Sequence, residues 1–345
     1  MRANWYGYNL KDYKAKMNYK NHPKIELHLH LDCSLSYEVA QQLNPSISEK
    51  EYQDSFIAPD KCLDLSDYIS RAVKGIELMQ TKQQLRWVTL DLFQQLKKDN
   101  VIYAEIRFAP LLHTAGGLRP EEVVSVVNKA VAEGIAEYEI DAGIILCTLR
   151  NYSQAQGMET VQLVKKFKGT HVVGFDIASD EANFPIDEHI KAFQFAKEHG
   201  INCTAHAGEA KGAESVVETL ENFQPVRIGH GVRSIEDPDL LKTLKQKKIH
   251  LEVCPTSNIQ VDVFDTIQDH SVDKLYKAGI SVGINTDARA ISNVTLTQEY
   301  QLLQEVFGWK SKDFKKCNLE AIEHSFASEE MKEKLRLEIE RGYSE

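Results

Sequence analysis

Short apolar runs rich in β-branched residues recur along the chain, and stretches with helical spacing separate them. Each run has the length and composition of a buried strand. We expect eight strands, at Lys24–His30, Val101–Phe108, Ala142–Thr148, His171–Ile177, Ile201–His206, Val226–His230, Ile249–Cys254 and Ile280–Thr286. We expect helices at Pro120–Tyr138, Met158–Phe167, Ile186–Glu198, Ala213–Glu221, Pro238–Gln246 and Val272–Ala278.

Strands that alternate with helices predict a parallel sheet, and the fold class is therefore α/β. Eight such units fit a closed (β/α)8 barrel, the TIM barrel. A doubly wound open sheet is the alternative, but it usually has a glycine-rich turn after its first strand. Here the first run continues as HLDCSLS, which favours the barrel. We expect residues 1–345 to form a single domain.

Two segments extend the expected barrel. Residues 33–100, between the first two strands, are too many for one crossover helix, and we expect them to form a helical lid insertion. Residues from about 293 to 345 have helical patterns, and we expect these extra C-terminal helices to pack outside the barrel.

Composition excludes several classes of protein. The formal charge of −10 is the wrong sign for a protein that binds nucleic acid. The chain has no apolar run near the roughly 18 residues that a membrane helix needs, and residues 1–20 lack the apolar core of a signal peptide. The six scattered cysteines are typical of reduced thiols. We therefore expect a cytoplasmic protein whose partner is a small molecule.

Ionisable residues stand near the carboxyl ends of several expected strands, the edge where barrel enzymes hold their active sites. The first strand ends in Leu-His-Leu-His. Others reach polar side chains at the same edge, namely Glu105, Arg107, Asp176, His206, Glu209, His230 and Asp287. A buried strand rarely ends in a charged residue so consistently, and we therefore expect a functional site here.

Four of these residues predict a metal site. Residues two apart on a strand point the same way, so His28 and His30 both face the barrel interior. Barrel closure brings Asp287 beside them, and His206 enters from the opposite wall. Three imidazoles and one carboxylate suit zinc. The alternative, four separately satisfied interior side chains, does not account for their convergence on one edge.

Two further residues have open roles at this stage. Glu209 follows His206 by three residues and is either a proton donor in the pocket or a glutamate that stabilises the start of a helix. His230 is either a fourth nitrogen ligand or a base beside the metal-bound water. The fourth strand carries Asp176 and no lysine to bridge two metals, which favours a single ion.

Several motifs together resemble those of the adenosine deaminases of the amidohydrolase superfamily. They are LHLHLDCS, the run from Ile177 through SDE, TAHAGE, RIGHGVR, LEVCPTSN and INTDAR, in family order from about Lys24 to past Asp287. The resemblance implies one zinc ion per chain, held by His28, His30, His206 and Asp287. It implies attack of zinc-bound hydroxide on C6 of adenosine, and also of 2′-deoxyadenosine, to give inosine and ammonia.

The resemblance also implies roles for individual residues. Glu209 would protonate the purine N1, and His230 would orient the metal-bound water, help to deprotonate it and stabilise the hydroxide, so that both act with Asp287 in catalysis. Substrate contacts would come from the ribose pocket, the end of the fourth strand and the lid, namely His30, Asp32, Ser179, Leu65, Tyr68 and Ile69.

Three positions depart from the family pattern. Cys33 and Ser179 stand where glycine is usual, and Ala288 replaces the second acid of an Asp-Asp pair that contacts the purine N7. The substrate is therefore less constrained than the reaction, and aminodeoxyfutalosine and adenine are alternatives to adenosine. A purine-nucleoside-binding protein without activity is the alternative from another class, but none of the catalytic residues is missing.

Overall fold

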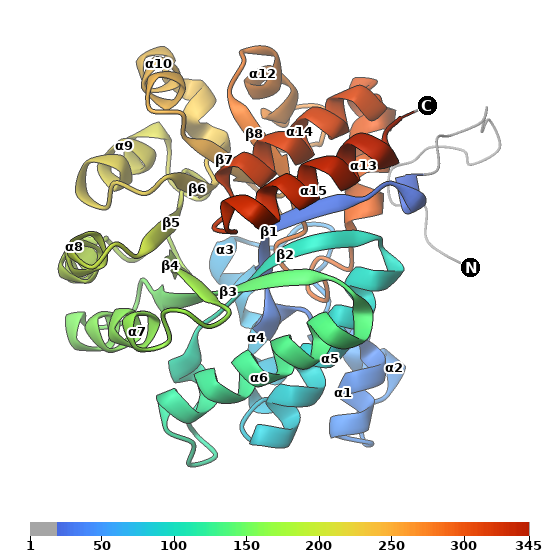
Figure 1. Cartoon of the computed structure of the whole chain (residues 1–345), viewed down its shortest axis with the longest axis vertical. Coiled ribbons are helices and arrows are strands. Elements are labelled where there is room, and N and C mark those ends of the chain that lie inside the picture. The colour runs from blue at the N-terminus through green and yellow to red at the C-terminus, as the bar shows by residue number, and fades with distance from the viewer. Residues whose placement is uncertain (1–18, 345) are drawn as a thin grey trace.

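The computed structural model describes residues 19–344 and contains eight parallel strands that follow one another around a barrel (Figure 1). The predicted (β/α)8 barrel is therefore confirmed. The strands are β1 (Lys24–His30), β2 (Val101–Phe108), β3 (Asp141–Leu149), β4 (Val172–Ala178), β5 (Asn202–Ala207), β6 (Arg227–His230), β7 (His250–Val253) and β8 (Ser281–Ile284). Each strand overlaps one of the eight predicted runs, and β1 and β2 have the predicted bounds.

Helices surround the barrel, and α6 and α10 have the bounds that the sequence predicts. In both, a proline occupies the first turn, where its missing N–H costs nothing. The α-helices are α1 (Tyr37–Leu43), α2 (Glu49–Ser55), α3 (Leu65–Ser70), α4 (Ala72–Glu77), α5 (Lys82–Lys98), α6 (Pro120–Tyr138), α7 (Gln154–Lys166), α8 (Ile190–Glu198), α9 (Ala213–Asn222), α10 (Pro238–Gln246), α11 (Pro255–Gln260), α12 (Val272–Lys277), α13 (Leu296–Phe307), α14 (Ser311–His324) and α15 (Glu329–Gly342).

The insertion between β1 and β2 has two parts. Its last helix, α5, packs against α6 and β2 and so serves as the crossover helix of the first barrel unit. The shorter helices α3 and α4 contribute side chains to the wall of a cavity at the carboxyl ends of the strands. Only the earlier part of the segment 33–100 therefore covers the barrel end.

The barrel closes between β1 and β8 through side chains as well as backbone. The side-chain oxygen of Asn285 accepts hydrogen bonds from two consecutive N–H groups of β1 at 2.8 and 3.0 Å, and Asn318 of α14 accepts from a third at 2.8 Å. Beyond them, Asp287 donates from its backbone N–H to His28 O (3.0 Å) and accepts from His30 N–H (2.8 Å). Closure thus fixes Asp287 against the two histidines of β1.

The C-terminal helices lie on the outside of the barrel, as expected. Helix α14 packs against β8 and β1, and α15 packs against α14. Within residues 19–344, no helix is long and apolar enough to cross a membrane. All six cysteines fall in this range and have free thiols. The segment predicted to lack the apolar core of a signal peptide consists largely of residues 1–18, which lie outside the described part of the chain.

Candidate active site

The four predicted metal ligands meet at the carboxyl ends of the strands. His28 and His30 come from β1, His206 from β5 and Asp287 from the segment after β8. One ligand atom from each lies within 4.8 Å of the others. His30 Nε2 is 3.1 Å from His206 Nε2 and 3.4 Å from Asp287 Oδ1, and His28 Nε2 is 3.2 Å from the same oxygen.

This donor set fits a metal ion. Two nitrogens held tetrahedrally at zinc bond lengths would stand about 3.3 Å apart, close to the separation of His30 and His206. The buried Nε2 of His28 has no hydrogen-bond partner. Burial, and then the positive charge of Arg107, act to lower the pKa of His28, but the nearby carboxylates of Asp287 and Glu252 outweigh both and raise it. The centre therefore favours a positive charge, which a metal ion would supply.

Carboxylates behind the histidines set the direction in which each ring faces. The Nδ1 atom of His28 lies 2.9 Å from Glu252 Oε2, and that of His206 lies 3.1 Å from Asp176 Oδ2. A carboxylate only accepts, so each Nδ1 carries the hydrogen and each Nε2 presents its lone pair to the centre. Both rings are thereby held in the tautomer that binds a metal.

One guanidinium joins the two carboxylates. Arg107, whose side chain is 0% exposed, donates to Asp176 at 2.8 Å and to Glu252 at 2.7 Å. Arg227 donates to the other oxygen of Glu252 at 2.6 Å. Burial acts to raise the pKa of Glu252, but the positive charges of Arg107 and Arg227 hold it well below its usual range. Both orienting carboxylates therefore stay ionised inside the barrel.

Glu209 lies beside the metal ligands at the end of β5. Burial, and then the negative charges of Asp287 and Glu181, raise the pKa of its carboxyl well above the usual value. Glu181 also anchors the loop, because its carboxylate accepts from four consecutive backbone N–H groups, from Gly208 at 2.7 Å to Lys211 at 3.1 Å. Glu209 is thus a fixed, buried carboxyl group that favours its protonated form.

Three residues at this edge adopt left-handed backbone conformations that non-glycine residues seldom occupy. The φ angles are 82° at Ser179, 61° at His230 and 63° at Asp287. Such conformations cost about 1–3 kcal/mol each and persist only where the surroundings enforce them. They cluster where β4, β6 and β8 end, as is common at functional sites.

A cavity opens beside these groups. Its wall from the lid helices includes Leu65, Tyr68 and Ile69, as predicted, and Asp32 and Ser179 line it with Cys33 and Ala288; the other lining residues are His30, Ala72, Ile76, Ala109, Leu112, Cys147, Leu149, Ala178, His206, Glu209, His230, Asp287 and Ile291. No lysine or arginine occurs among these lining residues of the described chain. The cavity is therefore suited to an uncharged ligand with an apolar face.

The predicted metal ligands, catalytic residues and substrate contacts all lie in the metal-ligand group or along the cavity. Among the other polar residues predicted at the strand ends, Glu105 lies elsewhere. It was expected at the carboxyl edge, and it instead lies deeper in the barrel, where it accepts from Arg227 at 2.5 Å. Two further residues of the site, Glu252 and Asn258, are not among those that the sequence predicts. The signal for Glu252 was a lone charge inside the apolar run LEVC, and Asn258 belongs to the PTSN segment that follows it.

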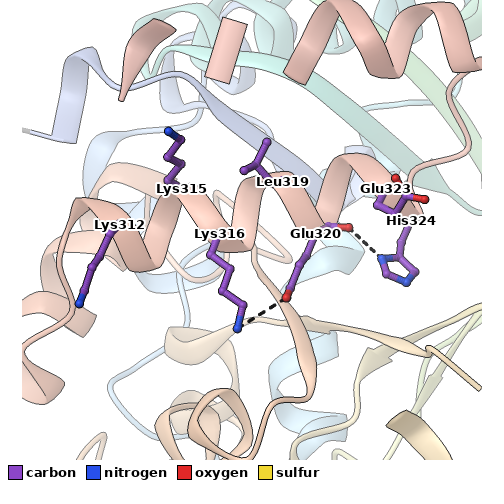
Figure 2. Close-up of a pocket in the computed structure, with 7 residues that line it drawn as sticks. All are labelled: Lys312, Lys315, Lys316, Leu319, Glu320, Glu323 and His324. Atoms are coloured by element: carbon purple, nitrogen blue, oxygen red, sulfur yellow. Dashed lines mark hydrogen bonds and ion pairs between the residues drawn. The ribbon is translucent and has the colours of Figure 1, made fainter. Parts of the chain in front are cut away.

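A second hollow lies on the outer face of α14, away from the cavity (Figure 2). It is lined by Lys312, Lys315, Lys316, Leu319, Glu320, Glu323 and His324. Several of its charges are paired at the surface, including Lys315 with Glu340 at 2.6 Å and Lys316 with Glu320 at 3.7 Å. Surface ion pairs of this kind indicate solvated side chains and no reactive centre.

The barrel and its group of three histidines and one aspartate are the arrangement expected of a hydrolase of the amidohydrolase type, in which such a group could hold a metal ion. A model of the adenosine deaminase family matches residues 23–341. An adenosine deaminase of Clostridium botulinum is 39% identical over 328 residues, covering 93% of this chain and 98% of the relative. One of Clostridium perfringens is 36% identical over 330 residues, covering 94% and 99%. The chain therefore belongs to the adenosine deaminase family.

A solved structure extends this comparison beyond adenosine. The adenine deaminase of Arthrobacter aurescens matches with a TM-score of 0.85 at 26% identity, covering 93% of this chain and 98% of the other. The same barrel and a related sequence are thus found in a protein whose named substrate is the free base. Family membership alone leaves the adenine compound to be decided by experiment.

Replacing Arg107 with methionine tests the ion pairs under the metal site. Asp176 would lose its guanidinium partner, and of its two guanidinium partners Glu252 would keep Arg227. Breaking a buried ion pair from one side typically costs about 3–5 kcal/mol, so we expect the free energy of unfolding to fall by that amount in urea titrations of metal-free protein. In the control, Arg86→Met removes a surface pair with Glu133 and should leave the free energy of unfolding nearly unchanged. Equal effects of the two substitutions would contradict this account.

Proposed function

We propose that this protein is a zinc-dependent hydrolase that converts adenosine, and also 2′-deoxyadenosine, into inosine and ammonia. The observation that carries the proposal is the convergence of a metal-ligand set and a buried carboxyl group with a raised pKa on one cavity, in a chain related to adenosine deaminases over nearly its full length. Water supplies the oxygen that replaces the amine at C6. Its two protons end on N1 of inosine and on the departing ammonia.

The proposed cofactor is one zinc ion per chain, held by His28, His30, His206 and Asp287. Zinc, when bound, lowers the pKa of a coordinated water to about 7 and so makes a nucleophile available at neutral pH. A second candidate group, formed by Glu209, His230 and Asp287, shares its aspartate with the first. Asn258 already donates toward Glu209 and His230, which favours a single ion.

Glu209 is proposed to supply the proton that activates the purine ring. An aromatic C6 is a poor electrophile until the adjacent N1 is protonated, and a general acid must be in its protonated form at the working pH. The raised pKa of Glu209 meets that condition. Because only the protonated form acts, activity is expected to fall as the pH rises through the pKa of this group.

The cavity supports an uncharged nucleoside as the substrate. Asp32 would accept a hydrogen bond from the ribose 5′-hydroxyl. It lies beside His30, whose Nδ1 is 3.9 Å from Asp32 Oδ1. Ser179 would offer its backbone N–H to the purine N3, and Leu65, Tyr68 and Ile69 would cover the base. A 5′-phosphate would meet Asp32 without a nearby cation among the lining residues. The side chain of Ala288, which is 2% exposed, has no donor that could form a hydrogen bond with the purine N7.

We also propose a cytoplasmic location and no nucleic-acid partner. Six free thiols suit a reducing compartment. A formal charge of −10 disfavours contact with a phosphate backbone. The site accepts a small purine compound inside a cavity, and a base held in a polynucleotide would have to leave its strand to reach it.

Metal analysis tests the cofactor. We expect one zinc per chain by elemental analysis of active protein, with activity lost on chelation and restored by zinc. His28→Ala should lose zinc and activity together, because the site would keep three protein ligands. Two tightly held ions per chain, or an active preparation without metal, would contradict the proposal.

Replacing Glu209 with glutamine separates proton donation from metal binding. The amide cannot supply the proton that N1 requires, so turnover of adenosine should fall by about 10²–10⁴-fold while zinc content stays at the parent level. Glu221→Gln, on the exposed end of α9, is the matched control and should leave turnover unchanged. A Glu209→Gln variant with parental turnover would show that this residue only stabilises the loop.

A substrate panel decides among the adenine compounds. We expect ammonia release from adenosine and 2′-deoxyadenosine, and little from AMP, because the cavity-lining residues within 19–344 include Asp32 and no lysine or arginine for the phosphate. Adenine and aminodeoxyfutalosine are the alternatives to be run beside them. Values of kcat/KM highest for one of these two would keep the reaction and replace the substrate.

A further inference from the structure

We infer that Asn258 is a positioning residue that turns the proton of Glu209 and the N–H of His230 toward the cavity. The inference rests on the proposed function and goes beyond it, because it assigns the direction in which two groups present their protons. Asn258 is buried within the short helix α11, in the PTSN segment that the proposed roles leave unexplained. Its side-chain amide contacts both groups.

The amide has only one orientation that satisfies its surroundings. The backbone N–H of Val272 donates to His270 Nδ1 at 3.0 Å, so the ring hydrogen of His270 lies on Nε2. His270 Nε2 is 3.3 Å from Asn258 Oδ1, which must therefore be the acceptor. Burial lowers the pKa of His270 to about 3, so the ring is neutral and this arrangement persists near neutral pH.

With its oxygen committed to His270, Asn258 directs both amide hydrogens at the catalytic groups. Nδ2 lies 2.9 Å from Glu209 Oε1 and 3.1 Å from His230 Nδ1. Each of these atoms accepts a hydrogen bond and cannot also hold a hydrogen pointing back at the amide. His230 Nδ1 also lies 3.3 Å from Glu209 Oε1, but a hydrogen on Nδ1 would oppose the amide hydrogen that points at it from 3.1 Å. The proton of Glu209 is therefore assigned to Oε2, and the hydrogen of neutral His230 to Nε2.

Both protonated atoms are then available to the cavity, which Glu209 and His230 line. Oε2 of Glu209 can give its proton to a ring nitrogen of the base. Nε2–H of His230 can donate a hydrogen bond to the oxygen of the attacking water. In this tautomer His230 holds the water in place and does not remove its proton, which narrows the roles that the resemblance left to it.

Hydrogen bonds of the surrounding segment hold Asn258 in position. Ser257, its neighbour, donates from Oγ to Asp287 Oδ2 at 2.7 Å, and the backbone N–H of Asn258 donates to Cys254 O at 3.0 Å. The N–H of Thr256 donates to the buried Glu299 at 3.0 Å. One short segment thus contacts a metal ligand through Ser257 and two proton-bearing groups through Asn258.

The experiment compares Asn258→Asp with the parent in zinc-loaded, full-length enzyme. Aspartate keeps the shape and can still accept from His270, but it offers acceptors where the amide offered donors. We expect ¹⁵N NMR to place the His230 hydrogen on Nε2 in the parent and on Nδ1 in the variant. His230→Asn assigns the resonance. Turnover of adenosine should fall by about 10²-fold or more, with zinc content and KM little changed.

A pair of variants at His270 tests the same arrangement without altering Asn258. His270→Gln keeps an N–H donor that can reach the amide oxygen, and His270→Phe removes the donor. We expect turnover to stay near the parent value in the first and to fall at least several-fold in the second, with the zinc contents equal. Asn222→Asp, exposed on α9, is the control for an added charge and should change neither the His230 signal nor turnover.

The results separate this inference from the proposed function. A parent enzyme with the hydrogen of His230 on Nδ1 would overturn the inference whatever the substrate proves to be. So would an Asn258→Asp variant whose His230 tautomer and turnover match those of the parent. If that variant does not fold, the His270 pair decides, and equal turnover of its two members overturns the inference. If the parent protein deaminates no purine, the proposed function is overturned, and the NMR measurement still determines the tautomer of His230.

Discussion

The shared ion pair of Arg107 with Asp176 and Glu252 is the interaction on which the rest of the site depends. A guanidinium with no exposed surface needs partners, and these carboxylates in turn hold His28 and His206. Each ion would be costly to bury alone, so the group is stable only when complete. The barrel holds the complete group together, because β2, β4 and β7 place its three charged side chains within hydrogen-bonding distance inside the barrel.

Barrel closure is the second constraint. Beside β8, the backbone N–H groups of β1 donate partly to side chains, those of Asn285, which follows β8, and of Asn318 on α14. Asp287 follows that seam with a left-handed backbone and reaches the histidines of β1. The metal site therefore lies across the point where the first and last strands meet.

The sequence predicted the elements that repeat a local pattern. Strand periodicity located all eight strands, and proline at the first turn marked the beginnings of α6 and α10. Helix α7 begins at Gln154 and not at Met158, because Ser153 and Gln156 form a capping box that the apolar spacing does not reveal. The segment expected to form a helix from Ile186 begins with a 3-10 turn, and α8 starts at Ile190.

By itself, the sequence determined the barrel, the order of its strands and the residues at the strand ends. Side-chain alternation and the succession of strands can both be recognised along the chain without knowledge of the packing. Only the tertiary structure decided which of those residues act together. Glu252 reaches Arg107 across 145 residues and His270 reaches the amide of Asn258 across a loop. Such hydrogen bonds join residues far apart in the chain, and no repeating pattern in the sequence indicates which of them will pair. The pairs form only when packing brings their atoms to hydrogen-bonding distance.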